Sequence, residues 1–89
     1  MIFDWDPANV DHIAQHGITS AACEEAYRNG PMVIEHQSRN DELRRLCLGE
    51  TDDGTLLTFV VTERKGKIRF VTAYPMHHRQ RGIYLGEDE

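Results

Sequence analysis

Long apolar segments are missing from this sequence. No stretch approaches the roughly 20 consecutive apolar residues that span a bilayer. The first residues, MIFDWDPAN, have neither the basic start nor the apolar run of a secretory signal. We therefore expect no membrane contact and a cytoplasmic location.

Cysteine is scarce. The chain of 89 residues contains two, Cys23 and Cys47, and no CxxC pattern. This spacing argues against the common zinc-binding frameworks and against a redox-active dithiol motif. Cys23 falls in a helical pattern and Cys47 in a strand pattern, so we expect both thiols to be reduced and structural rather than bonded or reactive.

Motifs of several enzyme classes are also missing. The sequence has no nucleophile elbow, and Gly49 and Gly54 flank an acidic turn instead of forming a phosphate-binding loop. His12 and His16 stand four residues apart, a spacing that can hold a metal ion on a helix. No third ligand accompanies them, so we expect His16 to cap the end of its helix, and we predict no metal site and no cofactor.

The overall composition is that of a folded protein. Apolar residues make up 39% and charged residues 28% of the chain, as is usual for globular domains and too apolar for a disordered chain. At this length we expect one domain over residues 1–89.

Two helices are predicted near the N-terminus, over residues 7–16 and 20–29. Asp6 followed by Pro7 supplies an N-cap and a proline at the first helical position. Gly17 then ends the first helix.

The pattern changes to strands after Pro31. Turn residues at 52–54 and 65–67 predict hairpins between antiparallel neighbours. The predicted strands cover residues 2–5, 32–35, 43–49, 56–63 and 68–74, and a short C-terminal helix covers 76–84. This order predicts an α+β fold, in which two N-terminal helices pack on one face of a four- to five-stranded antiparallel sheet and the other face is available for function.

Charge is distributed unevenly. The net charge of −5 argues against a protein whose whole surface is basic. Residues 64–84 nevertheless contain six cations and no acid, and two histidines stand in the same stretch. The cations are Arg64, Lys65, Lys67, Arg69, Arg79 and Arg81, and the histidines are His77 and His78. The C-terminal part is therefore a candidate anion-binding region, although cations around a hairpin turn can also be simply solvated.

Imidazole and guanidinium groups suit the cleavage of RNA without a metal. That reaction needs a base for the 2′-hydroxyl, an acid for the leaving oxygen, and cations for the negative charge on the phosphorus centre. Strand alternation places Arg69 and Tyr74 on opposite faces, so only one of them would belong to a given site unless the strand end twists. Adjacent His77 and His78 cannot share a helix face, so at most one would be catalytic.

Two separated blocks of the sequence resemble the BrnT family of bacterial toxins. The first block is Phe3-Asp4-Trp5-Asp6-Pro7-Ala8, followed by His16-Gly17-Ile18-Thr19 and Glu25-Ala26. The second block is Arg44, Gly49, Gly54-x-Leu56-Leu57, Val60-Val61-Thr62-x-Arg64, Ile68-Arg69, Ala73, Arg81 and Tyr84. The resemblance covers about residues 2–84, and the blocks agree with the family in order, spacing and residue type.

This resemblance implies a small RelE-like domain and the toxin of a type II toxin–antitoxin pair. Such a toxin would be a metal-independent endoribonuclease that acts on ribosome-associated or free mRNA and blocks translation. Its implied partner is a BrnA-like ribbon-helix-helix antitoxin, and the pair would contact operator DNA only through that antitoxin.

The site residues follow from the resemblance together with the chemistry above. Candidate catalytic residues are Arg64, Arg69, His77, His78, Arg81 and Tyr84. Candidate RNA-binding residues are Arg44, Lys67, Tyr74 and Arg79. The chain departs from the family at four positions, with His12, Gln15, Tyr74 and Gln80 where the family usually has Asn, Lys, Arg and Glu. An alternative is therefore a catalytically degenerate binding module that acts through its complex with the antitoxin.

Overall fold

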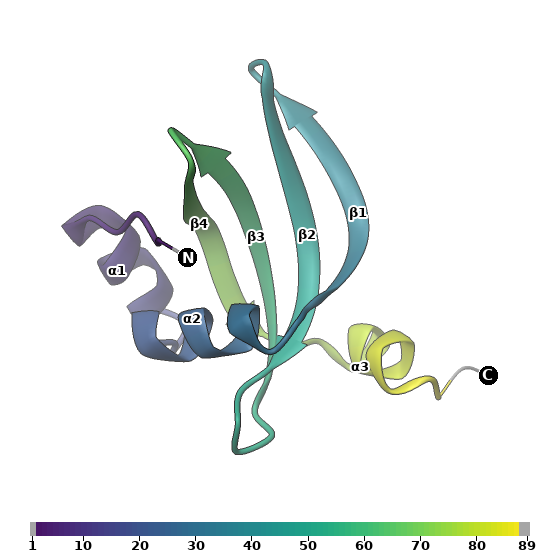
Figure 1. Cartoon of the computed structure of the whole chain (residues 1–89). Coiled ribbons are helices and arrows are strands. Elements are labelled where there is room, and N and C mark those ends of the chain that lie inside the picture. The colour runs from purple at the N-terminus through teal and green to yellow at the C-terminus, as the bar shows by residue number, and fades with distance from the viewer. Residues whose placement is uncertain (1, 88–89) are drawn as a thin grey trace.

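The structure, a computed structural model, describes residues 2–87 (Figure 1). Of the expected domain 1–89, Met1, Asp88 and Glu89 lie outside these residues. The elements are α1 (Pro7–Ala14), α2 (Ser20–Arg28), β1 (Met32–Arg39), β2 (Glu42–Glu50), β3 (Leu56–Arg64), β4 (Lys67–Pro75) and α3 (His78–Leu85). The α+β class is confirmed, and so is the predicted order of two helices, four strands and a short helix after residue 6, but the strand predicted before them is not formed.

The four strands form one antiparallel meander in the order β1-β2-β3-β4. The residues 2–5 do not add a fifth strand, because Phe3 makes only an isolated parallel bridge to Ile68. β1 is longer than predicted and turns into β2 through Asn40 and Asp41, which have φ angles of 53° and 63°. Two positive φ angles define the tight hairpin turn that Asn tolerates well.

Local chemistry explains where the two N-terminal helices begin. The Asp6 carboxylate accepts a hydrogen bond of 2.9 Å from the Asn9 N–H, and Pro7 occupies the first position of α1. The Thr19 hydroxyl accepts a hydrogen bond of 3.1 Å from the Ala22 N–H at the start of α2. Each side chain satisfies an N–H that the helix itself leaves without a partner. No helix within residues 2–87 has the length and apolar character needed to cross a membrane.

The hydrophobic core lies between one face of the sheet and the helices α1 and α2. Phe59 and Phe70 are fully buried at its centre, and the Trp5 ring stacks on Phe70 with 5.1 Å between ring centroids. Trp5 and Phe3 therefore anchor the N-terminal segment to the core. Figure 1 shows α1 and α2 on one side of the sheet and α3 on the other.

Both cysteines belong to this core and carry free thiols, as predicted. Burial raises the pKa of the Cys23 thiol to about 12 and also raises the pKa of Cys47. Neither sulfur is therefore a reactive thiolate at neutral pH.

A β-bulge at Val71 decides which side chains share the second face of the sheet. Along β3, Thr62 pairs with Arg69 and Thr58 pairs with Tyr74, because the register shifts between Val60 and Val61. The extra residue in β4 reverses the alternation of side chains. The prediction that Arg69 and Tyr74 point to opposite faces was therefore wrong. We call the face that they share, which is opposite to the face that carries the core residues Phe59 and Phe70, the open face.

Candidate functional site

Cations gather on the open face near the tips of the two long hairpins. Arg44 and Arg69 are both paired with Thr62, one on each side of β3. Two strand spacings separate their Cα atoms, a distance of about 10 Å. Arg64 lies two residues beyond Thr62 on β3 and pairs with Lys67 on β4. We call Arg44, Arg64, Lys67 and Arg69 the cation row.

Glu42 holds two members of the cation row together. Its Oε1 accepts a hydrogen bond of 3.0 Å from Arg44 Nε, and its Oε2 accepts one of 2.8 Å from Arg64 Nε. The hydrogen bond from Arg64 lowers the pKa of Glu42 the most, and the bond from Arg44 lowers it further, so this pKa lies below its usual range. Because both bonds use Nε, they leave the terminal nitrogens of the two guanidinium groups for another anion.

Arg69 has carboxylate partners of its own. Its Nη2 donates a hydrogen bond of 2.9 Å to Asp6 Oδ2, and its Nη1 lies 3.6 Å from Asp4 Oδ2. The Asn9 N–H and, after it, the Arg69 guanidinium lower the pKa of Asp6. The Arg69 side chain is 16% exposed, so this residue joins β4 to the N-terminal segment and shows little of its charge to solvent.

The helix α3 lies on the same open face, at the other end of β3. Gln80 Oε1 accepts hydrogen bonds of 2.7 Å from the Thr58 hydroxyl and 3.1 Å from the His77 N–H. The Tyr84 hydroxyl donates a hydrogen bond of 2.8 Å to Glu50 Oε1. Burial raises the pKa of Tyr84 the most, and the hydrogen bond to Glu50 raises it further. The phenol therefore stays neutral and able to donate a proton.

Three of the predicted catalytic residues lie at the start of α3 and within it. His77 is the N-cap of α3 and has an extended backbone, whereas Arg81 and Tyr84 lie three residues apart on adjacent turns of the helix. We call these three the helix stripe. It combines an imidazole, a guanidinium and a neutral phenol.

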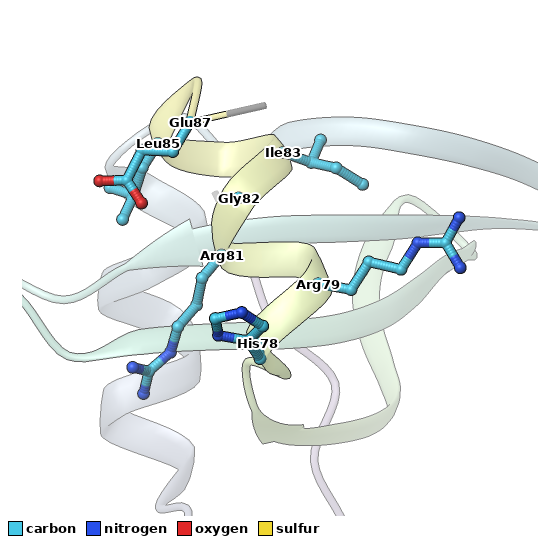
Figure 2. Close-up of a pocket in the computed structure, with 7 residues that line it drawn as sticks. All are labelled: His78, Arg79, Arg81, Gly82, Ile83, Leu85 and Glu87. Atoms are coloured by element: carbon cyan, nitrogen blue, oxygen red, sulfur yellow. The ribbon is translucent and has the colours of Figure 1, made fainter. Parts of the chain in front are cut away.

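The two arginines of α3, Arg79 and Arg81, lie on different sides of the helix. Figure 2 shows Arg79 and Ile83 on one side of the helix and His78 and Arg81 on the other. Arg79 and Arg81 are therefore not brought together. Within residues 2–87, neither of them nor Lys67 forms an ion pair.

Two histidines that were not predicted in the site lie next to it. The His16 ring lies 5.7 Å from the His12 ring and 6.3 Å from the Tyr74 ring, and Tyr74 lies 5.0 Å from His77, all between centroids. The His16 ring thus packs between two other rings, where a role at the helix end was expected. No group of three metal-ligating side chains that could hold an ion is found among residues 2–87.

The cation row and the helix stripe cannot contact the same phosphodiester. On β3, Thr62 lies between Arg44 and Arg69 of the cation row, and the Thr58 hydroxyl donates a hydrogen bond to Gln80 of α3. Four residues of a strand separate them, a distance of about 13 Å. The predicted catalytic set is therefore divided into one group near the hairpin tips and one group on α3.

Comparison with known protein families gives a match. A family model described as "Ribonuclease toxin, BrnT, of type II toxin-antitoxin system" matches residues 5–80. This range contains the cation row and His77, and it ends just before Arg81 and Tyr84. No curated protein matches the chain.

Proposed function

Because this chain belongs to the BrnT family of ribonuclease toxins of type II toxin–antitoxin systems, we propose that it is the toxin of such a pair and that it cleaves RNA without a metal ion. The observation that carries the proposal is the helix stripe of His77, Arg81 and Tyr84, which lies on the same open face as the cation row. One face thus offers both proton-transfer groups and cations.

The helix stripe contains the three functions that the reaction needs. The His77 imidazole accepts the proton of the 2′-hydroxyl, and the 2′-oxygen attacks the adjacent phosphorus. The bond from phosphorus to the 5′-oxygen breaks, and Tyr84 gives its proton to that oxygen, which leaves a 2′,3′-cyclic phosphate. The Arg81 guanidinium stabilises the negative charge on the non-bridging oxygens.

His77 is a better candidate for the base than His78. The His77 ring packs against the Tyr74 ring of the sheet, with 5.0 Å between centroids, whereas His78 belongs to the exposed surface of α3. The cation row, about 13 Å away, binds phosphates of the same RNA strand that flank the cleavage point. Arg79 adds a further cation on α3.

The remaining parts of the proposal concern the fold type and the partner. A RelE-like arrangement is supported by the helices that precede the antiparallel meander and by α3 on the open face. A BrnA-like ribbon-helix-helix antitoxin would hold the toxin inactive in the cytoplasm and would carry the pair to operator DNA. Ribosome-associated and free mRNA are both substrates that this open face could receive.

Induction in cells and cleavage in vitro test the function together. We expect the wild-type chain to arrest growth, its antitoxin to reverse the arrest, and the purified protein to cleave RNA in the presence of EDTA. Arg81→Ala should lower the cleavage rate by about 100-fold, as expected when a preorganised charge is lost. Cleavage that requires added metal would contradict the metal-independent mechanism, and intact RNA from free and ribosome-bound samples would contradict the nuclease.

A second candidate is the degenerate binding module, and one observation favours it. Arg44, Arg64 and Arg69 each have a carboxylate partner already, so part of the cation row is neutralised within the chain. In this case the protein binds the antitoxin but leaves RNA intact. Combining Tyr74→Arg with Gln80→Glu would then restore cleavage, and a carboxylate at 80 can still accept the bonds that Gln80 Oε1 accepts now.

A further inference from the structure

Four aromatic side chains form a row along β4 on the open face. They are His12 of α1, His16, Tyr74 of β4 and His77. We propose that this ring row binds unpaired bases of single-stranded RNA by stacking. The inference rests on the proposed function, because it assumes that RNA is the substrate, and it assigns the bases a place separate from the phosphates.

The ring row is held in place by several elements. His12 Nε2 lies within hydrogen-bond distance, 3.0 Å, of the Thr72 hydroxyl of β4. Tyr74 is fixed by its pairing with Thr58 in the sheet, and the His77 N–H is bonded to Gln80. Because the rings come from α1, β4 and the start of α3, their arrangement is set by the fold before any ligand binds, which lowers the entropic cost of binding.

The rings are open to solvent and do not belong to the hydrophobic core. His12, His16 and His77 are exposed, and Tyr74 is half-buried. In the part of the chain from 2 to 87, no carboxylate forms an ion pair with any of the three imidazoles. Each ring therefore leaves part of its surface accessible to a ligand.

The position of the cation row beside the rings favours a single strand of nucleic acid. The bulge at Val71 places Arg69, Thr72 and Tyr74 on one face in that order along β4. A strand that follows β4 would therefore meet cations first and rings next. Sites for single-stranded RNA combine a cationic track for phosphates with rings for bases, whereas paired bases in a duplex are not accessible for stacking.

Binding of an RNA that cannot be cleaved tests this inference separately from catalysis. The probe is a fluorescein-labelled 2′-O-methyl oligonucleotide, which lacks the 2′-hydroxyl nucleophile, and its partner is an oligonucleotide of the same length and charge with abasic sites. Fluorescence anisotropy at fixed salt gives the dissociation constants. We expect the wild-type protein to bind the abasic probe more weakly, by about 5- to 100-fold for each base that stacks.

Matched variants locate the effect. Tyr74→Leu should weaken binding of the complete probe by about 5- to 100-fold, whereas Tyr74→Phe, which keeps the ring, should stay within about 2-fold. His16→Ala and His16→Phe form a second pair at an exposed position, where loss of the side chain leaves the core intact. Circular dichroism confirms that each variant is folded.

Three results would overturn the inference. The first is equal binding of the complete and abasic probes by the wild-type protein, and the second is unchanged binding of the complete probe by both Tyr74→Leu and His16→Ala. The inference would also be overturned if the ring variants no longer bound the antitoxin but bound the RNA probe as tightly as the wild type does. The rings would then be a protein-binding surface. If binding depends on the rings but no RNA is cleaved, only the proposed nuclease function is contradicted. If RNA is cleaved but binding does not depend on the rings, only the proposed role of the ring row is contradicted.

Discussion

The two ends of the open face differ in chemistry. At the hairpin tips, guanidinium groups lie against Glu42, Asp4 and Asp6 and keep their charge at any pH near neutrality. At the α3 end, the imidazoles of His16 and His77 lie beside the Tyr74 ring. Tyr84 is the one predicted catalytic residue there with a carboxylate partner among residues 2–87.

This difference suggests a division of labour. Permanently charged groups can bind phosphates but cannot exchange protons, whereas imidazole exchanges protons near neutral pH. The carboxylates orient the guanidinium groups and also reduce their net charge, so the hairpin end positions RNA weakly. Chemistry is therefore expected at α3, and the following predictions test that assignment.

Deleting Val71 should have the largest effect. Without the extra residue, Phe70 and Ala73 cannot both face the core, where each is fully buried. We expect a loss in the free energy of unfolding of at least about 3 to 5 kcal/mol, comparable to the removal of a buried Phe side chain. Urea unfolding followed by circular dichroism measures it. Val71→Thr keeps the bulge and should be close to wild type; equal stability of the deletion variant would show that the bulge is not required.

Replacing His77 should separate the catalytic end from the binding end. His77→Asn keeps a residue that caps helices well but removes the imidazole, so we expect the cleavage rate to fall by about 100- to 10,000-fold with little change in stability. His78→Asn is the matched control and should change the rate less than about 10-fold. The rate is measured under single-turnover conditions. A larger loss for His78→Asn would exchange the two assignments.

Neutralising the hairpin end should change binding more than chemistry. For Arg44→Gln combined with Arg64→Gln, we expect the slope of log affinity against log salt to become shallower by about 1.4, which is 0.7 for each lost contact to single-stranded RNA. Arg28→Gln on α2 removes the same charge from the helix side of the sheet and should leave the slope unchanged. A salt titration of the uncleavable oligonucleotide provides the measurement. An unchanged slope in the double variant would remove these residues from the RNA site.

The smallest effect concerns pH and the ion pair of Arg69. The pKa of Asp6 is lower in the folded protein than in the unfolded chain. Its stabilising effect is therefore present above the unfolded pKa of about 3.9 and disappears as the pH falls through the lower folded pKa. Asp6→Asn keeps the N-cap without the charge, so the difference in Tm between wild type and variant should shrink between pH 5 and pH 2. A constant difference would show that the charge of Asp6 contributes nothing.

Much of the architecture followed from local patterns. Caps and stops at Asp6-Pro7 and Gly17 marked α1, and alternating apolar residues with turn residues marked the strands of the meander. The Asn40–Asp41 turn was missed, although Asn followed by Asp between two strand-like segments is a readable signal for a tight hairpin. The isolated bridge of Phe3 could not be predicted, since residues 2–5 have a strand pattern but too little length to show how they pair.

The candidate site was predictable in part. The cations and histidines of residues 64–84 were visible as a cluster in the sequence, but their division between two ends of one face was not. His12 and His16 lie about 60 residues away from Tyr74 and His77 in the chain, and no local pattern connects them. Carboxylate partners such as Glu42 were hidden for the same reason.

The sequence by itself determined the family, the order of helices and strands, and the concentration of positive charge near the C-terminus, because all of these depend on residue type and short-range spacing. Tertiary structure alone decided that Arg69 and Tyr74 share a face and that rings from three elements meet beside β4. The physical reason is the bulge at Val71: one extra residue reverses the alternation of side chains, and its position is set by the pairing of β4 with β3.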